Sequence, residues 1–375
     1  MIVENINIEP KKPRIIVSAL DWGLGHATRI IPLVTTLEAA GAEVILAASG
    51  SARILLQKEL PGRLLLTIPG YDIRYGKNNK TFFLKLLLQL PKVMGIIRKE
   101  NKMLRTMIAE NRIDAVISDN RFGFYSSQVP SVYITHQLYI ETGGGKAVNA
   151  QAQKIHYGYI KKFSECWVPD FTEAGLAGKL SHPQQLPSVP VKYLGPLSRL
   201  KKEQQHTEEK KLLIVLSGPE PQRSIWEEQL LQQLKTYQGK VVLVRGLPQP
   251  DVPGIEAGDH CTVHNYLSSE ALAVQMLQAA MVICRSGYST VMDLAALDKK
   301  AILVPTPGQG EQEYLGQYLM EEKFFYSCTQ EQFRLEDALK NVQDFPFKKI
   351  QDVTAGLHIP VILDWIERLK LRAGQ

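Results

Sequence analysis

Short apolar runs recur along the chain, and most are followed by a polar turn and then by a stretch with helical spacing of its apolar residues. Runs of four to six apolar residues bounded by turns indicate buried strands, whereas apolar positions three and four apart indicate helices. Regular alternation of the two predicts a parallel sheet wound on both faces. The strands expected from this pattern are residues 14–19, 43–48, 115–118, 129–136, 166–169, 191–194, 212–217, 240–246, 281–284 and 301–304.

A polar linker divides this pattern into two similar halves. Residues 194–211 are charged and have little apolar periodicity, and residues 212–217 restart the alternation of strand and helix. A chain of 375 residues is also long for one core. We therefore expect two Rossmann-like, doubly wound α/β domains that face each other across a cleft. The expected boundaries are 1–198 and 199–358, with 359–375 forming a helix that packs back on the first domain.

The stretch 281–317 carries the strongest functional signal in the pattern. Each of its two strands ends in a polar loop that opens a helix, first at Ser286 and Gly287 and again at 305–310. Open α/β sheets bind ligands at the carboxyl ends of their strands, and helix N-termini attract phosphate. A single Gly and Ser turn would more simply end a strand, but two such junctions in one unit favour a nucleotide site. Asp293 follows within the first of these helices, where its carboxylate can accept hydrogen bonds from a ribose.

Charge is unevenly distributed between the halves. Residues 1–200 carry 25 Lys and Arg against 15 Asp and Glu, and residues 74–112 alone carry ten basic and two acidic side chains. Apolar residues are interleaved with them at 81–97, a combination typical of a membrane surface or of a helix that covers a core. Pro91 divides the segment, so we expect one short helix before it and one after. A nucleic-acid site fits less well, because the segment is rich in leucine and its aromatics are few.

Other classes of protein are disfavoured by composition. The four cysteines are scattered without the spacing of zinc ligands, and no apolar run is long enough to span a bilayer. The first residues lack the apolar core of a signal peptide. We therefore expect a cytoplasmic protein without a resident metal or cofactor, able to lie on the inner face of the membrane.

Six segments, in order along the chain, resemble motifs of the GT-B glycosyltransferases of family 28. They are GLGHATR (23–29), VPSVYITHQ (129–137), YLGPLSR (193–199), VHNYL (263–267), CRSGYSTVMDLAALDKKAILVP (284–305) and GQGEQEYLGQ (308–317). The family includes an enzyme of peptidoglycan synthesis. This chain departs from that enzyme at Trp22 and Leu24, at Asp293 in place of a Glu, and at Glu313 in place of a Gln. The resemblance therefore implies nucleotide-sugar chemistry on a GT-B fold with a different acceptor.

The resemblance also implies roles for residues of the second half. Tyr266 and Leu267 would lie against the uracil of a UDP-sugar, and Asp293 would bind its ribose. Gln312 and Glu313 would read hydroxyls of the sugar. The remaining donor-side residues would surround the diphosphate, although Arg285 fits a structural ion pair equally well: Arg199, Ser217, Gly218, Arg285, Ser286, Gly287, Ser289 and Thr290.

Glycosyl transfer needs a group that deprotonates the acceptor, and a histidine on a loop at the end of a strand suits this task. His26, between Gly23 and Gly25 and the helix that follows, is the first candidate for this base. His136 would orient the acceptor, and Asp21 and Asp119, on the same rim, are the alternative candidates for the base. No D-x-D motif occurs, so fixed hydrogen-bond donors would stabilise the leaving diphosphate without Mg²⁺.

The sequence therefore predicts transfer of a hexose or N-acetylhexosamine from a nucleotide sugar to an acceptor hydroxyl, and the resemblance implies that the donor is a UDP-sugar and that transfer is a single displacement with inversion. The basic segment favours a lipid-linked acceptor and contact with anionic membrane. Two alternatives stay open. One is a UDP-sugar 2-epimerase, which needs no acceptor, and the other is a nucleotide-sugar-binding protein without catalysis. The sugar, the acceptor and the oligomeric state are left open by these residues.

Overall fold

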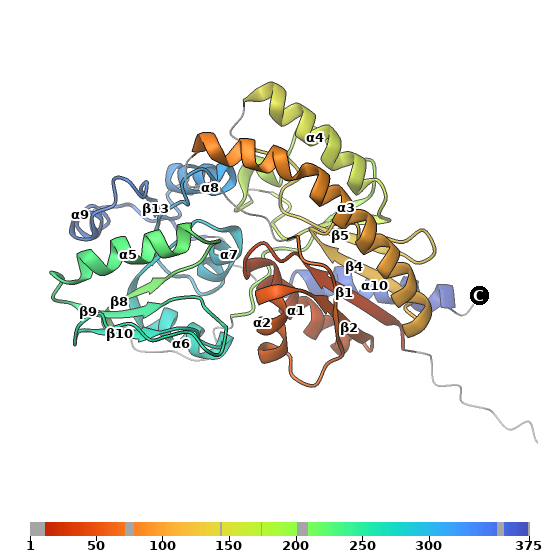
Figure 1. Cartoon of the computed structure of the whole chain (residues 1–375), viewed down its shortest axis with the longest axis horizontal. Coiled ribbons are helices and arrows are strands. Elements are labelled where there is room, and N and C mark those ends of the chain that lie inside the picture. Colours follow the sequence, from red (N-terminus) through yellow and green to blue (C-terminus); the bar gives the residue numbers. More distant parts are fainter. Residues whose placement is uncertain are drawn as a thin grey trace, which may run out of the picture.

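Two parallel sheets lie next to each other in the computed structural model, and helices pack on the faces of each (Figure 1). The structure describes residues 12–71, 79–142, 145–173, 175–200, 209–350 and 356–373. The expected linker at 194–211 and the basic segment at 74–112 therefore fall partly outside the described residues.

The first sheet has seven strands in the order β3-β2-β1-β4-β5-β6-β7, and every neighbouring pair is parallel. Val, Ile and Leu fill its central strands, as expected for a sheet that is covered on both faces. Its strands are β1 (Arg14–Ala19), β2 (Glu43–Ala48), β3 (Leu65–Thr67), β4 (Ala115–Asp119), β5 (Ser131–Ile134), β6 (Glu165–Val168) and β7 (Val191–Tyr193).

The second sheet repeats this winding with six parallel strands in the order β10-β9-β8-β11-β12-β13. Its strands are β8 (Glu209–Val215), β9 (Lys240–Val244), β10 (Cys261–His264), β11 (Ala279–Cys284), β12 (Ala301–Leu303) and β13 (Tyr326–Ser327). The helices of the whole chain are α1 (Gly25–Ala39), α2 (Gly50–Glu59), α3 (Asn79–Asn111), α4 (Lys146–Ile160), α5 (Gln222–Leu234), α6 (Ser269–Gln278), α7 (Tyr288–Ala296), α8 (Gly310–Glu321), α9 (Leu335–Asn341) and α10 (His358–Ala373).

Both sheets reverse their strand order at one point, between β1 and β4 and between β8 and β11. The loops that leave two such strands diverge, and ligands of open α/β sheets bind in the crevice between them. The predicted doubly wound α/β architecture with two Rossmann-like domains is confirmed. The expected strands at 14–19 and 43–48 agree with β1 and β2 in both bounds.

The prediction of two short helices separated by Pro91 is wrong. The structure has one helix, α3, that runs from Asn79 to Asn111 with Pro91 inside it. A proline removes one helical hydrogen bond and crowds the preceding turn. The sequence on both sides of Pro91 consists largely of strong helix formers such as Leu, Lys and Met, so both halves are helical and only the local bond is lost.

Apolar packing continues from one domain into the other. A single cluster of buried side chains contains Ala27 of α1 in the first domain and Met292 of α7 in the second. No helix in the described part of the chain is both long enough and apolar enough to cross a membrane.

The last helix, α10, packs on the first domain although it follows the second in sequence. Trp365 is 2% exposed, and its ring meets Trp167 of β6 edge to face with 5.3 Å between centroids. Arg368 pairs with Glu165, and the His358 ring lies 2.9 Å from the Thr36 hydroxyl of α1. Because α10 returns to the first domain, it limits how the two sheets can turn relative to each other.

We expect Trp365→Ala to lower the free energy of unfolding by about 3–5 kcal/mol, because it removes a large buried ring and leaves a cavity. Leu371→Ala on the same helix is the control, since Leu371 is 71% exposed and its loss should cost less than about 0.5 kcal/mol. Urea denaturation of the two variants measures the difference. Equal stabilities would show that α10 does not depend on this contact.

Candidate active site

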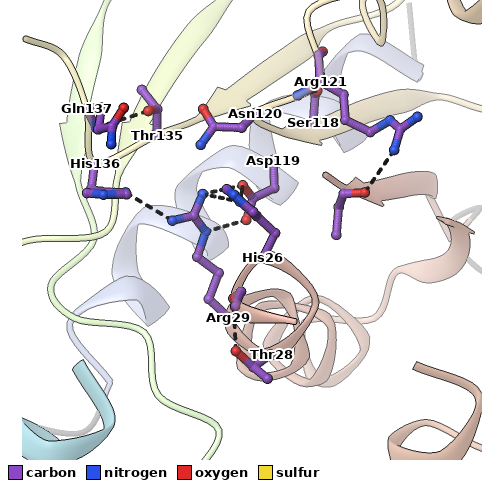
Figure 2. A network of polar contacts seen from close by, with 12 residues as sticks. His26, Thr28, Arg29, Ser118, Asp119, Asn120, Arg121, Thr135, His136 and Gln137 are labelled. Carbon is purple, nitrogen blue, oxygen red and sulfur yellow. Dashed lines mark hydrogen bonds and ion pairs between the residues drawn. The ribbon is translucent and has the colours of Figure 1, made fainter. Parts of the chain in front are cut away.

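Polar side chains meet at the switch point of the first sheet. His26 lies in the first turn of α1, directly after β1, and Asp119 is the last residue of the neighbouring strand β4. The two side chains point toward each other, with His26 Nδ1 2.8 Å from Asp119 Oδ1 (Figure 2). Asp119 is fully buried, whereas His26 keeps 17% of its side chain exposed. The strand register that pairs Ala19 with Asp119 brings them together.

Arg29 completes this cluster from the next turn of α1. Its guanidinium donates to both oxygens of the Asp119 carboxylate. Its Nη1 also donates to His136 Nδ1 at 3.1 Å, just beyond the end of β5. A bidentate arginine is the strongest partner for a buried carboxylate, so Asp119 is ionised. Sequence reasoning missed Arg29, although its position three residues after His26 on a helix places both on one face.

These contacts bear on the tautomers of both histidines. His26 Nδ1 lies 2.8 Å from Asp119 Oδ1, which can only accept, and 2.9 Å from Arg29 Nη2, which can only donate. Because Arg29 Nη2 already donates to Asp119 Oδ1, we assign the proton on His26 Nδ1 to the hydrogen bond with Asp119. Within the described part of the chain no hydrogen bond reaches His26 Nε2, which is therefore the free, basic nitrogen. His136 has the opposite tautomer. Its Nδ1 accepts from Arg29, and its Nε2 donates to Glu311 Oε1 at 2.7 Å.

Burial and the charge of Arg29 lower the pKa of His26 below 6.5, although Asp119 acts in the opposite direction. Burial alone would raise the pKa of Asp119, but the charges of Arg29 and His26 and their hydrogen bonds outweigh it and lower that pKa. At neutral pH the pair therefore consists of a neutral imidazole and a charged carboxylate. This is the state that a general base requires.

The second domain contributes Glu311 and Tyr288 to the same place. Glu311 lies in the first turn of α8 and bonds to His136, whose ring stacks on Tyr288 at 4.2 Å. The Tyr288 hydroxyl donates to the Pro169 carbonyl of the first domain at 2.9 Å. Sequence reasoning missed Glu311, which adjoins the predicted Gln312. The sequence feature that could have identified Glu311 is its place as an acidic residue in the first turn of a helix that was predicted to face the site.

A glycine lets the helix N-termini of the two domains approach each other. A Cβ atom added to Gly25 would lie 2.5 Å from the Ser289 hydroxyl in the first turn of α7. Any larger residue at position 25 would push α1 and α7 apart. The preceding Gly23 has a φ of +85°, which an L side chain rarely adopts, and its amide donates to the Asp21 carbonyl. Glycine is thus favoured at position 25 by the close approach of α7 and at position 23 by the positive φ.

Hydrogen bonds join the turn before α7 to the first turn of α8, and the first turn of α8 to the loop before it. Ser286 is fully buried and its hydroxyl donates to the Gln312 carbonyl at 2.7 Å. The Gln312 side chain accepts from the Thr306 amide at 2.9 Å, and Glu313 accepts from the Gly308 amide at 2.8 Å. Gly287 caps α7, and Ser289 and Thr290 are half-buried in its first turn. Ser217 and Gly218 form the turn after β8, at the switch point of the second sheet.

Arg285 supports these loops from inside the domain. It is fully buried and donates to the carbonyls of Val304 and Pro305, and its guanidinium lies 4.9 Å from the Trp226 ring centre. Burial lowers its pKa to about 9. Among the described residues no carboxylate forms an ion pair with it. Arg285 therefore holds loop carbonyls together in this structure and is turned away from solvent.

Glu59, the last residue of α2, joins the first domain to the residues predicted at the nucleotide base. It accepts from Arg199 Nη1 at 3.0 Å, from the Tyr266 hydroxyl and from both the amide and the hydroxyl of Ser269. Leu267 packs against the main apolar cluster. No sequence signal pointed to Glu59, because its partners are more than a hundred residues away.

Asp293 is buried in α7 with 8% exposure, and the Ser198 hydroxyl donates to it at 2.5 Å. Burial raises its pKa from 3.8 to about 6, although Arg199 and Ser198 act to lower it.

Asp21 lies outside the histidine cluster, where it accepts from the Tyr71 amide at 3.0 Å and faces Arg121 at 3.6 Å. The structure therefore brings together His26, Asp119 and His136, with Gly25 beside Ser289.

Comparison with known proteins identifies the second domain. Residues 202–355 match the model of the glycosyltransferase family 28 C-terminal domain. The second domain thus resembles the C-terminal domain of the family 28 glycosyltransferases, and the whole chain has the GT-B fold. No curated protein matches the chain in sequence.

Solved structures share the architecture of the whole GT-B chain at low sequence identity. The glycotransferase of kitacinnamycin superposes with a TM-score of 0.60 and 16% identity, over 97% of this chain and 96% of its own. MurG from Acinetobacter baumannii has a TM-score of 0.53 and a sequence identity of 15%, over 96% of this chain and 100% of its own. The spinosyn rhamnosyltransferase SpnG, complexed with thymidine diphosphate, has a TM-score of 0.55 and a sequence identity of 14%, over 96% of both chains.

We expect Asp293→Asn to stabilise the protein in the absence of ligands at high pH. Because the folded pKa of about 6 lies above the unfolded value of 3.8, the contribution of Asp293 to stability is fully present below pH 3.8 and is lost as pH rises through 6. Asparagine accepts from Ser198 without a charge, so its gain should be on the order of 2–3 kcal/mol at pH 8.

Chemical denaturation of both proteins between pH 8 and pH 5 measures this gain, which should shrink as the pH falls. A loss of stability in Asp293→Asn at pH 8 would show that Arg199 fully compensates the Asp293 charge. Ser198→Ala serves as the control for the shared hydrogen bond.

Proposed function

We propose that this enzyme transfers a hexose or an N-acetylhexosamine from a UDP-sugar to a hydroxyl of a lipid-linked acceptor, with inversion and without a metal ion. The observation that carries the proposal is the His26–Asp119 pair, which lies beside the N-terminus of α7 through the contact of Gly25 with Ser289. The proposed base, His26, and the proposed diphosphate site at the N-terminus of α7 are therefore adjacent, as direct displacement requires.

In this reaction His26 Nε2 removes the proton of the acceptor hydroxyl as its oxygen attacks the anomeric carbon of the sugar. The bond from that carbon to the diphosphate oxygen breaks on the opposite face, and the electron pair leaves with the nucleoside diphosphate. Asp119 keeps Nδ1 protonated and stabilises the imidazolium that forms, in the way that a buried carboxylate supports a catalytic histidine. Arg29 keeps Asp119 ionised and in position.

The leaving diphosphate would bind at the N-terminus of α7. Amides at the start of α7 and the hydroxyls of Ser289 and Thr290 can supply donors there, and the helix dipole favours negative charge. The absence of a D-x-D motif supports a reaction without metal, in which these donors stabilise the leaving group. That SpnG is described in complex with thymidine diphosphate supports a nucleoside diphosphate as the leaving group.

The donor sugar would lie between α8 and the histidine cluster. Gln312 and Glu313 remain the proposed readers of its hydroxyls, and the half-exposed Glu311 is added to them because its carboxylate faces the cluster. A bound donor would have to share or replace the His136–Glu311 contact. Asp293, with Tyr266, Leu267 and Arg199 nearby, remains the proposed site of the nucleoside.

The acceptor is proposed to be lipid-linked because the first domain carries the basic, leucine-rich segment 74–112. Its residues from Asn79 onward form α3 on the outside of that domain, where the helix can meet an anionic membrane surface (Figure 1).

A UDP-sugar 2-epimerase is the second candidate, and one observation favours it. Such a reaction needs acidic and basic groups around one sugar, and the structure brings Glu311 and Asp119 to the same cluster of histidines. Release of a free UDP-linked product without any acceptor would identify this activity. Binding of the donor without turnover, with acceptor extracts supplied, would instead indicate a non-catalytic sugar-nucleotide-binding protein.

We expect His26→Ala to lower kcat/KM by about 10²–10⁴-fold, the usual contribution of a general base. In the wild type, kcat/KM should begin to fall with acidification only below pH 6.5, because the pKa of His26 is lowered. In Asp119→Asn this fall should occur at a still lower pH, since Asp119 raises the pKa of His26.

His260→Ala is the matched control, because His260 bonds to the Leu234 carbonyl in the second domain, away from the cluster. Near-normal turnover in a folded His26→Ala variant would remove His26 from the role of base.

The donor assignment is tested by thermal shift with a panel of nucleotide sugars, with and without Mg²⁺. A donor at a hundredfold excess over its dissociation constant should stabilise the protein by about 2.7 kcal/mol. A shift by one UDP-sugar that is equal in the presence of Mg²⁺ and of EDTA is the expected result. No shift with any nucleotide sugar would contradict the proposed function and leave the fold unaffected.

A further inference from the structure

The carboxylate of Glu59 belongs to the first domain but is bound by residues that follow the first sheet in sequence. Glu59 is the last residue of α2, on the side of the first domain that faces the second (Figure 1). Arg199 Nη1 donates to it at 3.0 Å and the Ser269 amide at 3.1 Å, and the hydroxyls of Tyr266 and Ser269 also donate to it. We call Arg199, Tyr266 and Ser269 the Glu59 donor set. Together they form a binding site for an anion, which the Glu59 carboxylate occupies.

The dipoles of the two helices act on Glu59 in opposite directions. A helix favours negative charge at its N-terminus and disfavours it at its C-terminus. Glu59 is at the C-terminal end of α2, whereas its carboxylate bonds to Ser269, the first residue of α6. The hydroxyl of Ser268 already caps α6 by accepting from the Ala271 amide, so the Ser269 amide is one of the helix donors that the cap leaves for another acceptor. The position of the Glu59 carboxylate therefore depends on the Glu59 donor set and not on its own helix.

Arg199 has a further hydrogen-bond donor that Glu59 does not use. The Arg199 side chain is 7% exposed, and its Nε is buried without a hydrogen-bond partner among the described residues. Its bond to Glu59 is made through Nη1. A buried donor without a partner is unfavourable, and arginine binds phosphate oxygens best through two parallel hydrogen bonds. A phosphate group can therefore satisfy Arg199 more completely than the Glu59 carboxylate does.

The Glu59 donor set overlaps the proposed donor site, because Arg199 is assigned there to the diphosphate and Tyr266 to the base. Two anions on one arginine repel each other, so the diphosphate and Glu59 exclude each other. We propose that Glu59 is an internal competitor of the nucleotide, which occupies Arg199 in the empty enzyme and is displaced by the diphosphate. For the identity of this ligand the inference rests on the proposed function.

Other contacts keep α2 beside the second domain when Glu59 is displaced. Lys58 Nζ donates to the Pro248 carbonyl at 2.5 Å and lies 5.1 Å from the centre of the Tyr266 ring. At the other end of α2, Gln249 Nε2 donates to the Ser51 hydroxyl at 3.0 Å. A tethered group that stays close to its site competes at a high effective concentration. The return of Glu59 to Arg199 would thus favour release of the nucleoside diphosphate after transfer.

The test measures binding of UDP by calorimetry to the wild type and to Glu59→Gln, which keeps the shape of the side chain and removes its charge. The apparent affinity of a ligand is reduced by the fraction of molecules in which its site is free. We expect Glu59→Gln to bind UDP about tenfold more tightly, as follows if Arg199 is free in about a tenth of the empty molecules. Glu38→Gln is the matched control and should leave the affinity unchanged, because Glu38 accepts from Arg63 Nε and Nη2 within the first domain.

Ser269→Ala is a second variant that leaves both Glu59 and Arg199 in place. It removes one hydrogen bond to Glu59 and retains the Ser268 cap, so it should also tighten UDP binding, by about threefold. Weaker binding in Glu59→Gln and Ser269→Ala would show that these residues contact the nucleotide directly and would overturn the inference. Unchanged binding in both would overturn it too, since Glu59 would then serve only the contact between the domains.

Inorganic diphosphate and uridine separate this inference from the proposed function. Glu59→Gln should bind inorganic diphosphate more tightly than the wild type, whereas uridine, which has no phosphate, should gain less than UDP. An equal gain for uridine and UDP would overturn the assignment to the diphosphate. If the wild type and the variants bind neither UDP nor any UDP-sugar, the proposed function fails and inorganic diphosphate still decides the inference. Equal diphosphate affinity in Glu59→Gln and the wild type, or no binding to Glu59→Gln, would overturn it.

Discussion

The buried charge of Asp119 is the interaction on which the candidate active site depends. A fully buried carboxylate is costly unless it is paired and hydrogen-bonded, and Asp119 accepts three hydrogen bonds: two from Nε and Nη2 of Arg29 and one from the imidazole of His26. Losing one partner of such a network commonly costs several kcal/mol, because the remaining charge is left uncompensated. The cluster is therefore held in one arrangement, and His26 Nε2 points away from it as the free nitrogen.

The same cluster connects the two domains. Arg29 donates to His136, and His136 donates to Glu311 of the second domain, so a chain of hydrogen bonds runs from α1 to α8. A second polar link, from Glu59 to Arg199 and Tyr266, joins the domains at α2. The domain contact in this structure thus includes polar groups that a ligand could also satisfy. Such contacts can exchange partners at low cost, unlike the continuous apolar packing of α1 against α7.

Helix α3 connects the outer surface of the first domain to its interior. Its buried face holds Glu100, which fixes Arg121 and the loop after Asp119, while Arg98, Lys102 and Arg105 lie on its outer face. One helix therefore carries both a row of exposed cations and a contact to the loop that begins at the active site. Proline inside this helix does not divide it, because strong helix formers lie on both sides.

Several features were determined by the sequence alone, because they depend on periodicity and local chemistry. The apolar runs gave the other strands of both sheets but not the short strands β3, β10 and β13. The polar turns after the predicted strands gave His26, Asp119 and the N-terminus of α7 as residues at strand ends. Sequence reasoning failed where partners are far apart in the chain. Glu59 and Glu311 acquire their roles from contacts that cross between domains. For Arg285 the sequence left a donor contact and a structural ion pair open, and the structure places its guanidinium inside the domain, bonded to loop carbonyls.

The gathering of Arg199, Tyr266 and Ser269 around the Glu59 carboxylate was likewise decided only by tertiary structure. Each of these residues could equally be a solvated polar group, since its neighbours in sequence do not reveal what the fold brings beside it. Burial, pairing and the pKa of His26 depend on distances across sheets and between domains, which a local pattern does not contain.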